Sequence, residues 1–348
     1  MNDYQKGRGA QFNSDNPFLK HRFEPEPPDP EEISSAPQTR FFTETPKKII
    51  SRFDSPDLGM GMSINPYQGC EHGCVYCYAR NSHEYWGYSA GLDFETKIIV
   101  KPNAPQLLEE QFLKKNWVPA VIEVSGNTDC YQPAERKFGI TRKLLEVFLK
   151  YRNPISMITK NALILRDKDL LSELAAHRLV HVYISITSLN EEVRSAMEPR
   201  TVTSKQRLRV IEQLTAAGVP VGVMTAPIIP GLNDQEIPKL IEASAQAGAL
   251  AAGLTVVRLN GSIGGIFEDW IHKAFPDRAE KVLSQIRDCH GGKLNDSRWG
   301  KRLRGEGKLA EHIHQLHRIS RLRYLKDRQM PAYDLNQFRK EGMQMRMF

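Results

Sequence analysis

The amino-acid sequence predicts an α/β protein with parallel strands, because short β-branched segments alternate with amphipathic helical segments from about residue 60 onward. The helical segments carry apolar residues at i, i+3 spacing, and two of them are followed by Gly218 and Gly248, as helix C-termini often are. Six strand–helix units fit a partial or full barrel, or a doubly wound sheet. The predicted strands are one just before Asn65, then Val121–Val124, Pro154–Ile158, Val180–Ile186, Val219–Met224 and Leu254–Val257.

Length and composition exclude two classes of protein. The chain has 348 residues, 40% of them hydrophobic, so it can bury the core of one large domain or two smaller ones. No run approaches the roughly 18 apolar residues of a membrane-spanning helix, and residues 1–30 hold no apolar segment typical of a secretory signal. We therefore expect a cytoplasmic protein with no membrane partner, whose five cysteines serve metal binding or chemistry rather than disulfides.

Charge and proline content divide the chain into three parts. Residues 1–45 are polar and proline-rich, and residues 23–30 (FEPEPPDP) cannot form a helix or a central strand, so we expect a disordered or extended N-terminal arm. Residues 46–290 form the α/β body. Residues 291–348 form a basic C-terminal extension, with 14 Lys and Arg against 6 Asp and Glu, whereas residues 1–290 are nearly neutral. The C-terminal extension contains a predicted amphipathic helix, residues 308–328, which either docks on the body or contacts the phosphates of a nucleic acid.

The strongest chemical signal is a cysteine-rich loop at residues 65–80, with the sequence NPYQGCEHGCVYCYAR. Cys70, Cys74 and Cys77 follow Cys-x3-Cys-x2-Cys spacing, and Gly69 and Gly73 allow the loop to wrap tightly around a bulky group. Thiolates suit zinc or iron–sulfur clusters. A structural zinc site usually needs four ligands in two pairs, and the sequence contains no second pair. Three cysteines on a four-iron cluster would leave one iron without a protein ligand.

This loop, together with the strand–helix units that follow it, resembles the radical S-adenosylmethionine (SAM) superfamily. Tyr76 and Tyr78 on either side of Cys77, Lys160 after the third strand and Ser185 on the fourth resemble the spore photoproduct lyase group, also called DNA repair photolyase-like. The resemblance implies a partial (β/α)6, TIM-like barrel. Residues 126–135, 166–167, 198–200 and 226–234 resemble uncharacterised members of that group.

The resemblance also implies the cofactors and their ligands. Cys70, Cys74 and Cys77 would hold a [4Fe-4S] cluster, with SAM on the open iron and Tyr76 packed nearby. The family often has a Gly-Gly-Glu segment at the end of the second strand, where this chain has Ser125, Gly126, Asn127, Thr128 and Asp129. Backbone oxygens there, or the Asp129 carboxylate, would accept the SAM ammonium. Lys160 would pair with the SAM carboxylate, and Ser185 would lie near the ribose or the methionine.

Four further residues are candidates for catalysis. Cys130 is either a hydrogen-atom donor or substrate contact, or a structural thiol. Tyr78 would relay a radical in the manner of the lyase group. Glu198 and Arg200 either line the substrate pocket or pair with each other.

The predicted function is SAM cleavage at the cluster, followed by hydrogen abstraction from an unidentified substrate. Reduced ferredoxin or a flavodoxin-type protein would supply the electron. The substrate is a nucleic-acid lesion in one interpretation, and RNA, a peptide or a metabolite in another, because fold and cofactor do not fix the substrate. A non-catalytic iron–sulfur or zinc protein that binds nucleic acid is the alternative from another class.

Overall fold

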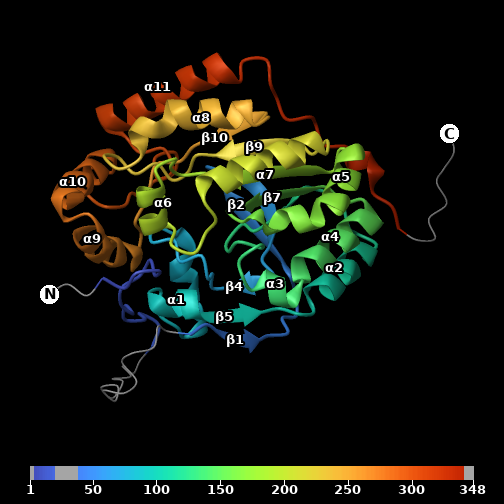
Figure 1. The fold of residues 1–348 in the computed structure, drawn as a ribbon. Helices are drawn as coiled ribbons and strands as arrows, with labels where there is room; N and C mark the ends of the chain where they lie inside the picture. The colour runs from blue at the N-terminus through green and yellow to red at the C-terminus, as the bar shows by residue number, and fades with distance from the viewer. Residues whose placement is uncertain (1–3, 20–37, 341–348) are drawn as a thin grey trace.

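The computed structural model describes residues 4–19 and 38–340, and its centre is a curved seven-stranded sheet (Figure 1). The strand order is β10-β9-β8-β7-β6-β3-β2, in which six strands are parallel and β2 at the edge is antiparallel to β3. The six parallel strands, each followed by helical structure, confirm the predicted partial (β/α)6 barrel. The strands are β2 (Ile50–Ser55), β3 (Gly59–Ile64), β6 (Ile122–Val124), β7 (Ile155–Thr159), β8 (Val180–Ser185), β9 (Val221–Met224) and β10 (Ala251–Gly253).

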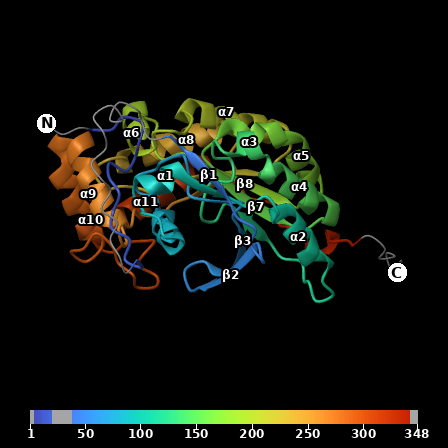
Figure 2. The same cartoon turned by 90° about the horizontal axis from the view of Figure 1, so that it is seen from below.

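Helices cover the outer face of this sheet and leave its inner face free of them (Figures 1 and 2). The covering helices are α2 (Ala104–Leu113), α4 (Ile140–Tyr151), α5 (Lys168–Ala176), α7 (Ser204–Ala216) and α8 (Ile237–Gln246). The others are α1 (Leu92–Thr96), α3 (Glu135–Phe138), α6 (Glu191–Met197), α9 (Ile263–Ala274), α10 (Ala279–Cys289) and α11 (Gly307–Tyr324). Short 3-10 helices are η1 (Tyr78–Trp86), η2 (Ala162–Asp167), η3 (Asp234–Glu236), η4 (Pro276–Arg278) and η5 (Leu335–Gln337).

The two faces of the sheet differ in burial because side chains alternate along a strand. Outward residues such as Ile122, Val182 and Val223 are fully buried in the main hydrophobic core against the helices. Inward residues such as Ser156 and Tyr183 are only half-buried. The fold therefore offers one packed face and one partly accessible face. None of the described helices has the length and apolar character needed to cross a membrane.

The prediction of the last strand was wrong in position. We expected Leu254–Val257, but the paired segment is β10 (Ala251–Gly253), and the later residues make one isolated bridge, between Val256 and Ile228. The strand β10 has the sequence Ala-Ala-Gly, which lacks the β-branched residues that usually mark a strand. A Cβ on Gly253 would lie 2.8 Å from the sulfur of Met224 on the neighbouring strand.

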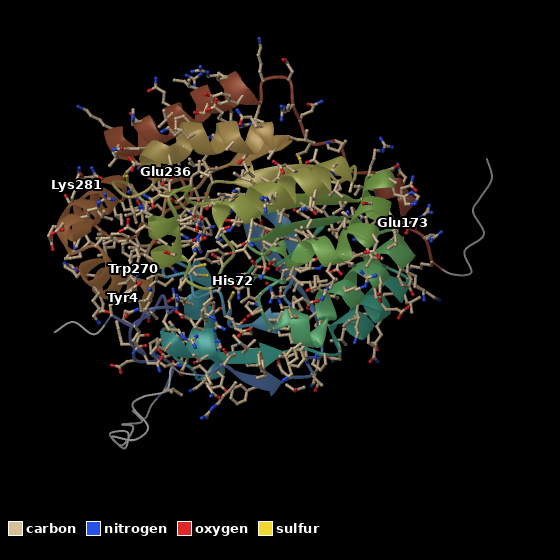
Figure 3. The ribbon with its side chains drawn as sticks, in the orientation of Figure 1. Tyr4, His72, Glu173, Glu236, Trp270 and Lys281 are labelled. Carbon is tan, nitrogen blue, oxygen red and sulfur yellow. The ribbon has the colours of Figure 1, made fainter. Side chains whose placement is uncertain are left out.

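A second, three-stranded sheet includes the beginning of the cysteine-rich loop. It has the order β1-β5-β4, with β1 (Arg40–Thr43) parallel to β5 (Lys97–Val100) and β4 (Tyr67–Gln68) antiparallel to it. The described part of the N-terminal arm is therefore extended on the body rather than free. Figure 3 shows Tyr4 beside Trp270 of α9. The segment 23–30 lies outside the described residues.

The C-terminal extension packs on the outside of the barrel and then crosses the end of the barrel at which β7 and β8 begin. Helix α11 lies along α8 (Figure 1). Residues 325–340, the C-terminal strap, then contact the segments that precede the strands: the Tyr333 hydroxyl donates to the Ile155 carbonyl at 3.1 Å and the Asp334 N–H to the Arg178 carbonyl at 3.1 Å. The strap thus lies at the amino ends of β7 and β8, opposite the cysteine-rich loop that follows the carboxyl end of β3.

Candidate active site

The cysteine-rich loop runs from β3 to η1 and brings its three cysteines together. Cys70 and Cys74 are each 7% exposed, Cys77 is half-buried, and all three are free thiols. Burial, followed by the charges of Asp129, Cys74 and Cys77, raises the pKa of Cys70 well above its ordinary value. The thiols are therefore close enough to influence one another, and a bound metal would have to stabilise their thiolates.

Glycine is required twice in this loop. Gly69 and Gly73 both have positive φ, +78° and +67°, a conformation that other residues rarely adopt. A Cβ on Gly69 would lie 2.9 Å from the Lys97 carbonyl oxygen, and one on Gly73 would lie 2.7 Å from Glu95 Oε2. The loop accordingly packs against β5 and α1 without space for a side chain at either glycine.

Two polar side chains that sequence analysis missed hold the loop backbone. Arg80 is fully buried and donates to the carbonyls of residues 73, 74, 90 and 91 and to Glu95 Oε1 at 2.5 Å. Gln132, also fully buried, accepts from the Glu71 N–H at 3.0 Å and donates to the Gly69 carbonyl at 3.0 Å. Each side chain therefore satisfies loop groups that would otherwise be buried without partners.

The N-terminal segment closes the outer side of the loop through the same Glu95. Gly9 and Ala10 donate their backbone N–H groups to the two oxygens of Glu95, at 3.3 and 2.8 Å. Gly9 approaches so closely that a Cβ there would lie 1.8 Å from the Gly73 carbonyl oxygen. The arm is thus in direct contact with the cysteine-rich loop.

Asp129, a candidate SAM ligand, has four protein partners in the structure. Its oxygens accept from the Thr159 hydroxyl and the Lys160 N–H, both at 2.8 Å, and from the Tyr131 N–H at 2.9 Å, and His72 Nδ1 lies 3.2 Å away. Burial alone would raise its pKa, but the His72 contact and these hydrogen bonds lower the pKa of Asp129 to about 2. A carboxylate with four partners is saturated, so Asp129 joins the ends of β6 and β7 to the loop.

Gly126 and Asn127 lie beside the loop at the carboxyl end of β6. The Gly126 carbonyl accepts a hydrogen bond from the Tyr78 hydroxyl. Asn127 donates its backbone N–H to Asn65 Oδ1 at 2.7 Å and its side-chain amide to Ser82 Oγ at 2.9 Å. These contacts fix the segment that sequence analysis placed next to the SAM ammonium.

Lys160 and Ser185 lie at the carboxyl ends of neighbouring strands, and the Lys160 ammonium lies 6.0 Å from the centre of the Tyr76 ring. Lys160 is half-buried, and its ammonium has no hydrogen bond or ion pair within the described parts of the chain. Burial lowers its pKa, but Cys74 and Glu198 outweigh this and raise the pKa of Lys160, so the ammonium stays charged. Ser185 is 1% exposed, and its hydroxyl likewise has no partner among the described residues. Both groups are available to a ligand.

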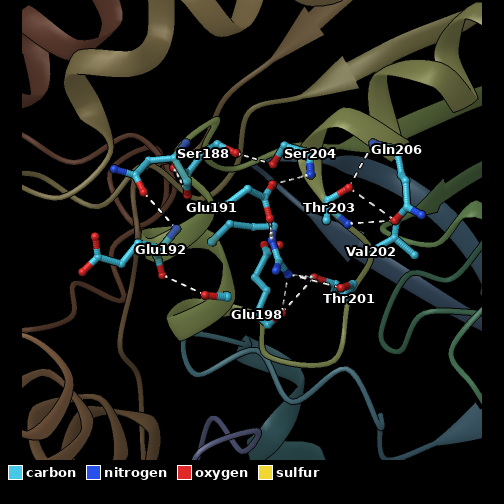
Figure 4. Close-up of polar contacts among 12 residues, drawn as sticks. Ser188, Glu191, Glu192, Glu198, Thr201, Val202, Thr203, Ser204 and Gln206 are labelled. Carbon is cyan, nitrogen blue, oxygen red and sulfur yellow. Dashed lines mark hydrogen bonds and ion pairs between the residues drawn. The ribbon is translucent and has the colours of Figure 1, made fainter.

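Glu198 and Arg200 do not pair with each other, which corrects one of the two alternatives. Glu198 is fully buried and binds Arg207 at 2.6 Å, the Thr187 hydroxyl at 2.8 Å and the Tyr76 hydroxyl. Burial would raise its pKa, but Arg207 and then Lys160 lower the pKa of Glu198 to about 2. Figure 4 shows Glu198 in the hydrogen-bonded connection between α6 and α7.

Arg200 instead binds the cysteine-rich loop. The Arg200 guanidinium lies 3.3 Å from Glu71 Oε1, and the backbone N–H of Arg200 donates to the His72 carbonyl at 3.3 Å. Figure 3 places His72 near the centre of the molecule. Glu198 and Arg200 thus brace the loop from the β8 side, Glu198 through Tyr76 and Arg200 through Glu71.

Cys130 lies apart from the other three cysteines. It is fully buried in the main hydrophobic core, whereas Cys70, Cys74 and Cys77 belong to the two smaller contact clusters. Burial raises the pKa of Cys130 well above its ordinary value. Tyr78, in contrast, is 49% exposed directly after Cys77.

A family model described as the Radical SAM superfamily matches residues 64–243, which include the cysteine-rich loop and the strands through β9. The chain belongs to the radical SAM superfamily. Membership implies a [4Fe-4S] cluster and SAM as cofactors. Curated relatives include an uncharacterised protein of Mycobacterium tuberculosis, 33% identical over 66% of each chain, and one of Methanocaldococcus jannaschii, 31% identical over 55% of this chain and 68% of that one. The chain thus spans just under two thirds of the mycobacterial relative.

Solved structures agree on the fold. A mutant of spore photoproduct lyase, and the lyase complexed with dinucleoside spore photoproduct, each superpose with a TM-score of 0.60, at 16% sequence identity, over 82% of this chain and 79% of that protein. At this identity the likeness shows the fold alone. The radical SAM barrel predicted from the sequence, with the fold of the lyase group, is confirmed.

The residues at this site fit the two implied cofactors. Cys70, Cys74 and Cys77 are free thiols on one loop, and thiolates are the ligands that a [4Fe-4S] cluster requires. The site also offers two groups that have no hydrogen bond or ion pair among the described residues, the buried Ser185 hydroxyl and the Lys160 ammonium, and a nucleoside carrying an amino acid can satisfy both.

Proposed function

We propose that this protein is a radical SAM enzyme in which Cys70, Cys74 and Cys77 hold the [4Fe-4S] cluster. The observation that carries the proposal is the loop of three free thiols together with two polar groups, Lys160 and Ser185, that have no hydrogen bond or ion pair among the described residues. A cluster held by these cysteines would, once reduced, supply the electron for SAM cleavage, the chemistry that begins hydrogen abstraction in this family. The protein contributes the ligands, their rigid support and the exclusion of water.

Individual residues would hold SAM as follows. The Lys160 ammonium would pair with the SAM carboxylate, and the Ser185 hydroxyl would bond the ribose or the methionine. Backbone oxygens of Gly126 and Asn127 would accept the ammonium of SAM. Because Asp129 already has four partners, we propose that it orients this segment rather than binding SAM itself.

The candidate catalytic residues divide into two groups. Tyr78, exposed and adjacent to Cys77, is the one best situated to relay a radical. Glu198 and Arg200 act by bracing Tyr76 and Glu71 of the loop. For Cys130 the structural-thiol alternative is favoured, since it is fully buried in the main core.

The proposal includes two candidate substrate classes, an electron donor and a surface for nucleic acid. A nucleic-acid lesion is one candidate, because the lyase of similar fold is described in complex with a dinucleoside photoproduct; RNA, a peptide or a metabolite is the other. Exposed arginines on α11 are the candidate contact with nucleic acid. We expect reduced ferredoxin or a flavodoxin-type donor as the electron source, and the cytoplasm, where thiols stay reduced, as the compartment.

The decisive experiment is anaerobic reconstitution with iron and sulfide, followed by dithionite and SAM. The proposed enzyme should contain about four irons per chain and form 5′-deoxyadenosine. Cys74→Ala should lose both the iron and the product, whereas Cys289→Ala, outside the site, should keep both. A loaded cluster that never cleaves SAM would indicate a binding protein instead, and one zinc per chain without iron would contradict the cluster.

A further inference from the structure

The inner face of the barrel carries a carboxylate that no part of the proposed SAM site uses. Glu123 is the middle residue of β6, between Ile122 and Val124, which are buried against the helices. In the sheet register it stands beside Ser63 of β3 and Ser156 of β7. Because side chains alternate along a strand, Glu123 points to the inner face, where it is half-buried.

Glu123 has no partner within residues 4–19 and 38–340. No hydrogen bond or ion pair reaches its carboxylate there, and burial alone raises its pKa above the ordinary value. Its Oε2 would lie 3.6 Å from a Cβ on Gly126, which places the carboxylate just below the end of β6. A half-buried charge without a partner costs folding free energy, and perturbed groups of this kind gather at binding sites.

Arg258, after β10, is a second half-buried charge in the same region. Its guanidinium carbon lies 5.7 Å from the centre of the Tyr78 ring, and the described residues give it no hydrogen bond or ion pair. The hydroxyl of Tyr78 donates to the carbonyl of Gly126, the residue that Glu123 approaches. Tyr78 therefore adjoins both charges, and it directly follows the cluster cysteine Cys77.

We propose that Glu123 and Arg258 bind the substrate, whose N–H donor group contacts Glu123 and whose oxyanion contacts Arg258, against the exposed ring of Tyr78. The opposite charges do not satisfy each other, so a ligand with complementary groups satisfies both at once. The proposal rests on the proposed function, because it makes this face the place where hydrogen is abstracted. A nucleotide and an amino-acid-like molecule share this chemistry.

The test uses two probes with both groups, cytidine 5′-monophosphate and 4-guanidinobutyrate, on the anaerobic, cluster-loaded protein with SAM. Binding is measured by ligand-observed NMR, beside methylguanidinium and butyrate, which each carry one group. Glu123→Gln should weaken binding of methylguanidinium and of the better two-group probe by tenfold or more, and leave butyrate unchanged. Arg258→Gln should show the reverse pattern for the single-group probes.

The controls separate this proposal from the proposed function. Glu146→Gln, an exposed carboxylate on α4, should bind every probe as the wild type does. The iron content of Glu123→Gln should equal that of the wild type, which shows that the variant folds and holds the cluster, and a wild type that cleaves no SAM would refute the enzyme without bearing on probe binding. Preference for the cytidine probe indicates a nucleotide substrate, and preference for guanidinobutyrate indicates an amino-acid-like one. If neither probe binds, or if Glu123→Gln binds both normally, the proposal is wrong.

Discussion

Replacing Gly9 with alanine should separate the N-terminal segment from the cysteine-rich loop. The new Cβ would lie 1.8 Å from the carbonyl oxygen of Gly73, and this is a backbone atom that cannot rotate away. The segment has to move, and Gly9 and Ala10 then stop donating their N–H groups to Glu95, at 3.3 and 2.8 Å. Glu95 keeps its ion pair with Arg80, so the loop loses its outer cover but retains its inner support.

The size of the effect follows from those two hydrogen bonds. Each one ends on a carboxylate and is worth about 1.5–3 kcal/mol, so their loss removes about 3–6 kcal/mol of docking free energy. At about 2 °C per kcal/mol for a large domain, the melting temperature should fall by about 6 °C or more. Because the segment contacts the loop that carries the cysteines, iron should also be released more easily.

The assay compares reconstituted proteins by thermal melting and by the iron that remains after exposure to a chelator. Gly265→Ala is the matched control, since it makes the same substitution on α9, where nothing lies within 4 Å of the new Cβ. Gly9→Ala should melt earlier and release iron faster than both the wild type and this control. A Gly9→Ala protein with wild-type melting and iron retention would show that the arm does not support the loop.

Three further predictions concern charges. Lys160→Ala should raise the Kd for SAM about 10- to 100-fold in equilibrium dialysis with the iron content intact, because one charged hydrogen bond is removed; an unchanged Kd would exclude Lys160 as a ligand. Since burial raises the pKa of Glu123, its ionisation destabilises the fold as the pH rises above about 4. The melting temperature of Glu123→Gln should therefore exceed that of the wild type only slightly at pH 4 and by more toward pH 7. A difference in melting temperature that does not change with pH would contradict the unpaired carboxylate. If nucleic acid binds α11, replacing Arg318, Arg321 and Arg323 with glutamine should reduce the salt slope of binding by about 0.9 for each phosphate that the protein no longer neutralises, and an equal slope would remove α11 from the interface.

Substitutions on α11 test the basic extension better than its removal does. Deleting residues 291–348 would also remove Ile313 and Leu325, which are buried in the main core. The C-terminal strap also bonds the segments before β7 and β8. A truncated protein would therefore lack part of its core, and weaker nucleic-acid binding would not be interpretable. Exposed arginines can be replaced without that cost.

The parts of the fold that the sequence predicts are those with local signals. Five of the six parallel strands lie where the short β-branched segments of the sequence predicted them. Their outward side chains pack on the amphipathic helices that alternate with these segments. The strand β10 was misplaced because its sequence, Ala-Ala-Gly, lacks the β-branched residues by which the other strands were recognised. The strands β1, β4 and β5 were not predicted, because they lie outside the strand–helix units that mark the parallel strands.

The same distinction applies to the candidate site. The three cysteines were recognisable because they stand within eight positions of one another, and the loop glycines carry the conformational requirement. Gln132 and Glu95 were missed because each is a single polar residue whose role depends on a tertiary contact with the loop. Nothing local distinguishes a buried glutamine that holds a loop from an exposed one. Arg80 was within reach, since an arginine three residues after Cys77 stands among residues expected to be buried.

The distribution of partnered and unpartnered charges indicates the side from which the substrate arrives. On the outer side of the cysteine-rich loop, Arg80 and Glu95 satisfy each other and the arm. On the inner side, Lys160, Glu123 and Arg258 have no ion-pair partner among the described residues. A half-buried charge is retained despite its cost where a ligand completes it. Lys160 belongs to the proposed SAM site, which leaves the other two for a second molecule, so we expect the substrate to bind the inner face, between β6 and the segment after β10.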